Sequence, residues 1–225
     1  MTRKKISPTI EDYLGILYVL ERDGEPIVGV HLAEILGVTP PTVTNTLKRM
    51  MRDTLIIEDS HGMHLSGKGL AVARSVMRRH MLSEWMLTHI LSWSQVHEEA
   101  HELEHAISER VEAALINELD QPIVCPHGNP LPGYEEKTAH WIALTNTTPR
   151  ENVIIRRVHE LAEEKPDLLL FLEENHILPG NEAYIESILP FNQTITIQIY
   201  HHSVTLGFPT AKYIFVEKVN PKLSD

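Results

Sequence analysis

Residues 97–105 read HEEAHELEH, a segment rich in side chains that bind divalent metals. The five-residue pattern HExxH occurs in it twice, because His97, His101 and His105 follow one another at intervals of four. On an α-helix such residues lie along one face, drifting by about 40° at each step. Imidazole nitrogens beside carboxylates at this spacing are typical of a transition-metal site. The segment therefore predicts a metal-binding helix, either catalytic, as HExxH is in metallopeptidases, or regulatory.

Further ligand-type residues come shortly before this segment. His80 and Glu84 are also four residues apart, so they share a face of a helix. Two neighbouring helices could then present six such residues to one another, namely His80, Glu84, His97, His101, Glu104 and His105.

The catalytic interpretation needs a third zinc ligand. The extended peptidase motif requires glycine where this chain has Glu104 or, for the second copy, Ser108. Glu112 and Glu118 remain as alternative third ligands. Because no second lobe for a peptide substrate is evident, we expect no enzyme, and a zinc metallopeptidase is kept as the alternative from a different functional class.

The composition fits a globular protein, with 42% hydrophobic and 23% charged residues among 225. A single cysteine, Cys125, excludes an internal disulfide framework and fits a reducing compartment. No apolar run approaches the roughly 20 residues that cross a bilayer, and the basic N-terminus lacks the apolar stretch of a secretion signal. We therefore expect a cytoplasmic protein with no membrane partner.

Charge is distributed unevenly along the chain. Residues 1–80 carry 11 Lys and Arg against 9 Asp and Glu, whereas residues 81–225 carry 9 against 22, which accounts for the net charge of −11. Only the first third suits contact with phosphates, and the acidic remainder suits cations.

The elements of this first third follow a recognisable order. Ser7 and Pro8 predict a helix start, which Asp23 and Gly24 end. A short helix over about 30–36 and a third helix capped by Thr39 come next, followed by two strands around Ser60-His61-Gly62. Three helices and a hairpin in this order predict a winged helix-turn-helix.

The third helix has the composition of a recognition helix. Val43, Leu47 and Met50 form its apolar face, and small polar or cationic residues cover the rest. Small polar side chains can bond to base edges while Lys and Arg contact phosphates. The candidate DNA-contacting residues are Thr39, Pro41, Thr42, Thr44, Asn45, Lys48 and Arg49.

The rest of the chain is predicted to be helical and then β-rich. We expect long helices over about 67–91 and 95–119, followed by an irregular connection over 121–134 that holds four prolines. Cys125 and His127 within this connection could chelate a metal, but we interpret the segment as a connecting loop. A helix near 165–174 and strands over 194–200 and 211–219 indicate a small β-barrel.

These pieces together resemble the diphtheria-toxin-repressor family of metal-dependent transcriptional regulators. The matching segments are TIEDYLGILYVL, HLAEILGVTPPTVTNTLKRM, LSGKGLAVARSVMRRHMLSEWML, HEEAHELEHAISERVEAAL and CPHGNPLPG. The resemblance implies a mainly α protein with a winged helix-turn-helix domain over 1–75, a helical dimerisation and metal-binding domain over 76–145, and an SH3-like, FeoA-like β-barrel over 146–225.

The resemblance also implies two metal sites. A primary site would use Asp12, His101, Glu104 and His105, with His80 able to join it; an ancillary site would use His80, Glu84, His97, Glu160 and Glu163. Carboxylate ligands favour Mn²⁺, while the imidazole of His101 also suits Fe²⁺, Zn²⁺ or Co²⁺. We therefore expect a homodimeric repressor of metal homeostasis that binds a double-stranded operator, responds to manganese or alternatively to iron, and has no small-molecule substrate.

Overall fold

The structure is a computed structural model, and it describes residues 6–60 and 62–219. Two compact units make up the chain. The first unit contains residues 6–83 and 100–118, and the second contains residues 84–99 and 119–219. The division falls inside two helices, α4 (Gly67–Leu87) and α5 (Val96–Glu104), so each helix contributes to both units.

The first unit begins with α1 (Pro8–Arg22), close to the predicted bounds. Proline suits the first helical position because its missing N–H has no partner there in any helix. Ser7 occupies the cap position with extended backbone, as predicted, although its side chain makes no capping hydrogen bond to the described residues. Tyr13, Leu14 and Leu17 are buried along one face of the helix.

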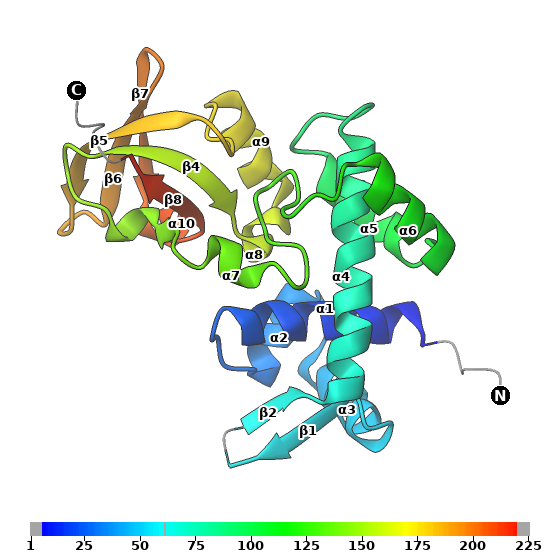
Figure 1. The fold of residues 1–225 in the computed structure, drawn as a ribbon. Helices are drawn as coiled ribbons and strands as arrows, with labels where there is room; N and C mark the ends of the chain where they lie inside the picture. The colour runs from blue at the N-terminus through cyan, green and yellow to red at the C-terminus, as the bar shows by residue number, and fades with distance from the viewer. Residues whose placement is uncertain (1–5, 61, 220–225) are drawn as a thin grey trace. The chain divides into compact units, whose positions relative to one another are not determined.

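The winged helix-turn-helix is confirmed. It consists of α2 (Gly29–Ile35), α3 (Pro40–Arg52) and an antiparallel hairpin of β1 (Ile56–Asp59) and β2 (Gly62–Leu65), which precedes α4 (Figure 1). Thr39 caps α3 as predicted, accepting a hydrogen bond from the backbone N–H of Thr42 at 3.4 Å. The hairpin turn was predicted to include His61, which lies outside the described residues.

Two predicted helix lengths were wrong. The helix expected over 67–91 ends at Leu87, and the helix expected over 95–119 is divided into α5 and α6 (Glu109–Glu118). Ser108 accounts for the division: its Oγ accepts a hydrogen bond from the backbone N–H of Val111 at 3.4 Å and so starts a new helix. His105 consequently lies in the turn after α5 rather than on the helix.

The second unit is built on an antiparallel sheet of strand order β3-β8-β4-β5-β6-β7 (Figure 1). Its strands are β3 (Ile142–Ala143), β4 (Asn152–Val158), β5 (Glu182–Leu189), β6 (Thr194–Ile199), β7 (His202–Gly207) and β8 (Ile214–Lys218). The short helix α7 (Glu135–Thr138) precedes the sheet, and helical segments connect its strands, namely η1 (Leu144–Asn146), α8 (Glu160–Glu163), α9 (Pro166–Glu174) and α10 (Phe208–Ala211).

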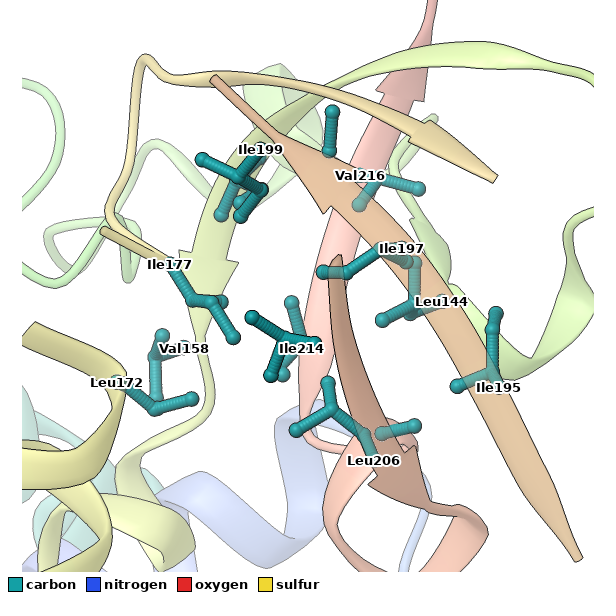
Figure 2. Packing of buried hydrophobic residues seen from close by; sticks show 14 of the residues in the cluster. Leu144, Val158, Leu172, Ile177, Ile195, Ile197, Ile199, Leu206, Ile214 and Val216 are labelled. Carbon is teal, nitrogen blue, oxygen red and sulfur yellow. The ribbon is translucent and has the colours of Figure 1, made fainter. Parts of the chain in front are cut away.

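Alternation of apolar residues explains this core. In β6, Ile195, Ile197 and Ile199 are each buried, because every second side chain of a strand faces the same side. They pack with Val216 of β8 and Leu172 of α9 (Figure 2). The predicted helix near 165–174 and the strands near 194–200 and 211–219 are confirmed, and the sheet forms the expected C-terminal SH3-like β domain, although β8 begins only at Ile214.

The segment over 121–134 is not an exposed linker. Residues 125–132 are buried, and Val124 pairs with Pro130 in an isolated antiparallel bridge. Gly128 adopts φ +89°, and a Cβ there would lie 1.9 Å from the carbonyl oxygen of Arg156, so glycine permits a close backbone contact with β4. Among the described helices, none combines the length and apolar character required to span a membrane.

Candidate metal centres and DNA-binding surface

The predicted DNA-contacting residues lie together on one exposed surface. Thr39, at the cap of α3, and the α3 residues Pro41, Thr42, Thr44, Asn45, Lys48 and Arg49 are all exposed. The opposite face of the helix buries Val43, Leu47 and Met50, as predicted. Thr44 Oγ1 donates to the carbonyl of Pro40 at 3.0 Å, and Arg49 pairs weakly with Asp53 at 3.9 Å. The exposed face of α3 therefore has donors and cations available to a nucleic acid.

The first unit brings the predicted primary-site residues together. The first-unit cluster consists of Asp12 from α1, His80 from α4, His101 and Glu104 from α5, and His105 from the turn after α5. One ligand atom from each of Asp12, His101 and His105 lies within 4.8 Å of the others, and the same is true of His80, His101 and Glu104. Three helices and a turn thus converge on one place.

Short contacts in this cluster join imidazole nitrogens to carboxylate oxygens. His105 Nε2 lies 2.9 Å from Asp12 Oδ1 and 3.5 Å from Glu104 Oε1. His80 Nδ1 lies 2.8 Å from Glu104 Oε2. Glu104 is 3% exposed, so its charge is held in a nearly dry environment. Such a carboxylate needs a compensating cation, either a protonated histidine or a metal ion.

The position of Asp12 fits a metal ligand. Its Oδ1 is buried and makes no hydrogen bond of acceptable geometry within the described residues, even though an imidazole nitrogen is close. Burial raises the pKa of the Asp12 carboxyl, against the lowering effect of His101 and His105. An oxygen without a hydrogen bond beside two imidazoles is an arrangement that a divalent cation would satisfy.

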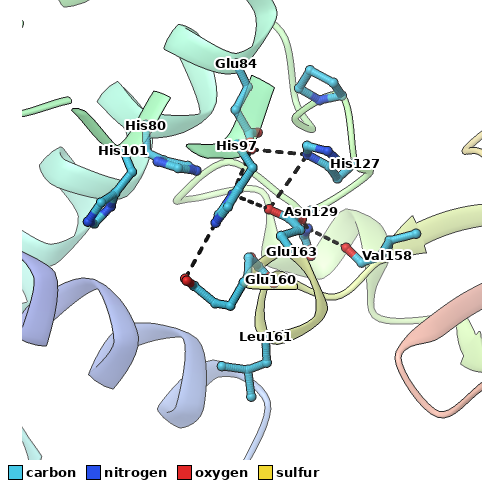
Figure 3. Close-up of polar contacts among 12 residues, drawn as sticks. His80, Glu84, His97, His101, His127, Asn129, Val158, Glu160, Leu161 and Glu163 are labelled. Atoms are coloured by element: carbon cyan, nitrogen blue, oxygen red, sulfur yellow. Dashed lines mark hydrogen bonds and ion pairs between the residues drawn. The ribbon is translucent and has the colours of Figure 1, made fainter. Parts of the chain in front are cut away.

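The second unit contains a second cluster, which we call the second-unit cluster. It consists of Glu84, His97, Cys125, His127 and Glu163. His97 Nδ1 lies 2.9 Å from Glu163 Oε2 and 3.3 Å from Glu84 Oε1. Figure 3 shows His97 and His127 both directed at these carboxylates.

The pKa values of both histidines of this cluster are raised above the ordinary value. Burial alone lowers the pKa of His97, but hydrogen bonds to Glu163, Glu164 and Glu84 outweigh it, and the net pKa lies well above the ordinary value. The pKa of His127 is likewise raised, because the charges of Glu163 and Glu84 outweigh its burial. A metal ion at this place would take over the positive charge that the two protons provide.

Glu163 and Glu160, the two residues expected from α8, have different surroundings. Glu163 lies beside His97, and the side-chain amide of Asn129 donates a hydrogen bond to its Oε1 at 2.5 Å. The carboxylate of Glu160 instead accepts a hydrogen bond from Arg157 Nη2 at 3.1 Å. Arg157 Nε also donates to Asn129 Oδ1, which holds the amide in the orientation that serves Glu163.

Sequence reasoning missed His127 and Cys125. It interpreted CPHG as a connecting loop, whereas ligand atoms of Cys125, His127 and Glu84 lie within 4.8 Å of one another. His127 is fully buried, with Nδ1 3.1 Å from Glu84 Oε1 and Nε2 3.1 Å from the carbonyl of Trp93. The Cys-x-His spacing was the available signal. Burial, together with the negative charges of Glu84 and Glu163, raises the pKa of the Cys125 thiol well above its usual range.

A winged helix with an exposed cationic recognition helix, next to a set of oxygen and nitrogen ligands, defines a metal-dependent DNA-binding regulator. Family models agree along the chain. An iron-dependent repressor N-terminal DNA-binding domain matches residues 5–61, an iron-dependent repressor metal-binding and dimerisation domain matches 66–133, and a FeoA domain matches 142–218.

Individual proteins agree as well. The chain is 34% identical to the iron-dependent repressor IdeR of Mycobacterium leprae over 225 residues, which covers 94% of this chain and 97% of the relative. Among solved structures, it is similar to a manganese-dependent transcriptional repressor in complex with manganese, with a TM-score of 0.82, 26% identity, and coverage of 93% of this chain and 100% of the other. It is also similar to ScaR with bound Cd²⁺, with a TM-score of 0.80, 31% identity, and coverage of 93% and 99%.

The chain belongs to the diphtheria-toxin-repressor family of metal-dependent transcriptional repressors. The metallopeptidase alternative is therefore wrong, since the relatives are DNA-binding repressors and not enzymes. The DNA-binding and dimerisation domains imply an operator DNA and a second copy of the chain as partners.

Proposed function

We propose that the protein is a manganese-responsive repressor whose first-unit cluster is the regulatory metal site. The proposal rests mainly on one observation. Ligand atoms of Asp12, His101 and His105 lie close together, and Oδ1 of Asp12 is buried with no hydrogen bond among the described residues. The five side chains of the cluster offer oxygen and nitrogen and no sulfur. Carboxylate oxygen suits Mn²⁺, and the imidazoles keep Fe²⁺ as the nearest alternative.

The mechanism follows from the elements that supply the ligands. Asp12 belongs to α1 of the winged helix, whereas His101, Glu104 and His105 belong to α5 and its turn. These side chains would hold the metal ion, whose positive charge would offset the repulsion between the carboxylates of Asp12 and Glu104. Asp12 then holds α1 in place, and α1 in turn positions α3 for the major groove of each half-site. Metal binding would favour DNA binding only to the extent that these side chains bind the ion more tightly in this ordered arrangement.

Glu84, His97 and Glu163 are proposed as an ancillary site in the second unit. The reason is their shared burial together with His127, since four buried ionisable groups within reach of one another need either protons or a metal ion to balance their charge. Glu160 of α8 is also proposed as a ligand of this site, although its carboxylate would first have to give up its hydrogen bond with Arg157. His80 is assigned to the first-unit cluster through Glu104.

A metal-titrated gel shift tests this function. DNA from upstream of the protein's own gene is titrated with the full chain in the presence of Mn²⁺, Fe²⁺ or Zn²⁺, each added separately. We expect Mn²⁺ to raise DNA affinity by about 5- to 150-fold, the range of ordinary allosteric coupling. Asp12→Ala and His105→Ala should remove this gain while leaving the dimer intact, and Glu182→Ala, an exposed carboxylate of β5, should retain it.

Two outcomes would change the proposal. If metal-free protein binds the DNA as tightly as Mn²⁺-loaded protein, the metal does not switch DNA binding. If Fe²⁺ activates at a lower free concentration than Mn²⁺, the protein is iron-responsive and the mechanism is retained with the other metal.

A further inference from the structure

Glu11 precedes Asp12 on α1, and the two carboxylates contact opposite edges of the same imidazole. Glu11 Oε2 lies 2.7 Å from His105 Nδ1, whereas Asp12 Oδ1 lies 2.9 Å from His105 Nε2. Neutral imidazole carries a hydrogen on only one of its nitrogens. If Glu11 accepts a hydrogen bond from Nδ1–H, the hydrogen of the neutral ring is on Nδ1. The free lone pair is then on Nε2, which faces Asp12 and Glu104.

Arg79 of α4 holds Glu11 in this position. Its Nη2 lies 3.4 Å from Glu11 Oε1, its Nη1 donates to the carbonyl of Ile107 at 3.3 Å, and its Nε donates to the carbonyl of Ser75 at 3.2 Å. The side chains of Arg79 and Glu11 are each 13% exposed. A guanidinium tied to its own helix and to the turn after α5 keeps a fixed geometry, and its permanent charge compensates the carboxylate.

His105 needs such a partner because of where it lies. It follows the last residue of α5, in the turn that Ser108 ends, so a regular helix does not set the direction of its ring. Its side chain is only 17% exposed, which leaves protein groups rather than water to orient it.

We propose that Glu11 is a positioning residue for the metal site: it accepts the Nδ1–H of His105, fixes the tautomer whose Nε2 can bind the metal, and is itself held by Arg79. The proposal rests on the proposed function, since it takes His105 as a metal ligand. Carboxylates that accept a hydrogen bond from a metal-binding histidine raise the basicity of the ring and fix its orientation. Asp12 would thus bind the metal directly, while its neighbour Glu11 would orient His105, another ligand.

Mn²⁺ affinity provides one test. Glu11→Ala and Glu11→Gln are prepared in the full chain with His97→Ala, so that only the first-unit cluster is titrated calorimetrically. We expect Glu11→Ala to weaken Mn²⁺ binding by about 10- to 100-fold, the usual effect of removing such a partner. Glu11→Gln keeps an oxygen that can accept the Nδ1–H and should lose less.

Glu112→Gln is the matched control. Glu112 forms a partly buried pair with another arginine of α4, Arg78, at 2.6 Å, so its loss removes a similar ion pair elsewhere in the first unit. Mn²⁺ affinity of this variant should stay within about twofold, since Glu112 contacts Ser75 and Arg78 rather than a ligand of the first-unit cluster.

The ring nitrogens of His105 provide a second test that needs no metal. Long-range ¹⁵N NMR of the metal-free protein, at a pH where the ring is neutral, should show Nδ1 protonated with Glu11 present and a mixture of tautomers in Glu11→Ala. Unchanged tautomer and unchanged Mn²⁺ affinity in Glu11→Ala, relative to Glu112→Gln, would overturn the inference. If Asp12→Ala and His105→Ala also leave Mn²⁺ affinity unchanged, the proposed metal site itself is wrong. Should Glu11→Ala not fold, Glu11→Gln and the tautomer measurement decide.

Discussion

Replacement of Gly128 by alanine should destabilise the second unit more than the same replacement at Gly133. Both glycines have positive φ, +89° and +104° respectively, so an alanine at either position is strained by about 1–3 kcal/mol. The surroundings differ. A Cβ on Gly128 would lie 1.9 Å from the Arg156 carbonyl oxygen and 2.8 Å from the Cα of Arg157, whereas a Cβ on Gly133 has no neighbour within 4 Å.

The difference between the variants isolates the cost of this close contact. Overpacking of a well-packed site costs typically about 1–3 kcal/mol, and this cost applies to Gly128→Ala alone. For a chain of this size, 1 kcal/mol lowers the melting temperature by about 2–4 °C. Gly128→Ala should therefore melt about 2–12 °C below Gly133→Ala in differential scanning calorimetry of the metal-free protein.

The same variant has a functional consequence. His127 and Asn129 flank Gly128, and both contact the carboxylates of the second-unit cluster. Gly128→Ala should weaken metal binding at that cluster, while the first-unit cluster, measured in the same titration, serves as the internal control. Equal melting of the two variants within about 1 °C would refute the reasoning, since the backbone would then yield at no measurable cost.

Further predictions concern DNA contacts, helix capping and pH. Arg49→Ala should weaken binding to all DNA sequences and reduce the slope of log affinity against log salt by about one, at unchanged Mn²⁺ affinity; an unchanged slope would remove Arg49 from the phosphate contacts. Thr39→Ala should cost about 1 kcal/mol in urea unfolding through the lost cap of α3, and Thr39→Ser should restore it. Because the pKa of His97 is raised, its imidazole holds a proton that metal must displace, so Mn²⁺ affinity in an Asp12→Ala background should rise with pH by up to about tenfold per unit. The stabilising effect of that proton on the metal-free protein has the opposite sign: it is complete below the ordinary pKa of about 6.5 and disappears as pH rises through the raised pKa of His97. Affinity that does not depend on pH would exclude proton displacement.

The elements with local start and stop signals were predictable from the sequence. Pro8 and Thr39 mark helix starts, and Asp23 with Gly24 marks an end, as the structure has them. These signals act on the nearest backbone groups, so no distant contact is needed to interpret them.

The break after Glu104 was not predicted, because the histidine spacing continues the helical period across it to His105. Ser108 competes with that period by capping a new helix, and periodicity alone does not register such a competition. The prediction of one continuous helical face for the three histidines therefore failed at its last member.

The contribution of residues 121–134 was hidden for a different reason. Prolines and glycines indicate irregular backbone, and irregular backbone usually lies at the surface. Here the segment is held by pairing between Val124 and Pro130 and by Asn129, whose side chain donates to the carbonyl of Val158 at 2.7 Å. The contact between Asn129 and Val158 joins residues 29 positions apart, and a local pattern carries no information about such contacts.

The two clusters differ in their access to water, and on the proposed assignment this difference would set how quickly each exchanges a metal ion. In the first-unit cluster the His101 side chain is 50% exposed and that of Asp12 is 23% exposed, so an ion can enter and leave from solvent. In the second-unit cluster the side chains of Glu84 and His127 are fully buried, so exchange there would require local opening of the protein. On the proposed assignment, the first would follow the free metal concentration promptly while the second equilibrates slowly. After a brief fall in metal supply the repressor would leave DNA with its slow site still loaded, and it would return to DNA as soon as the fast site refills.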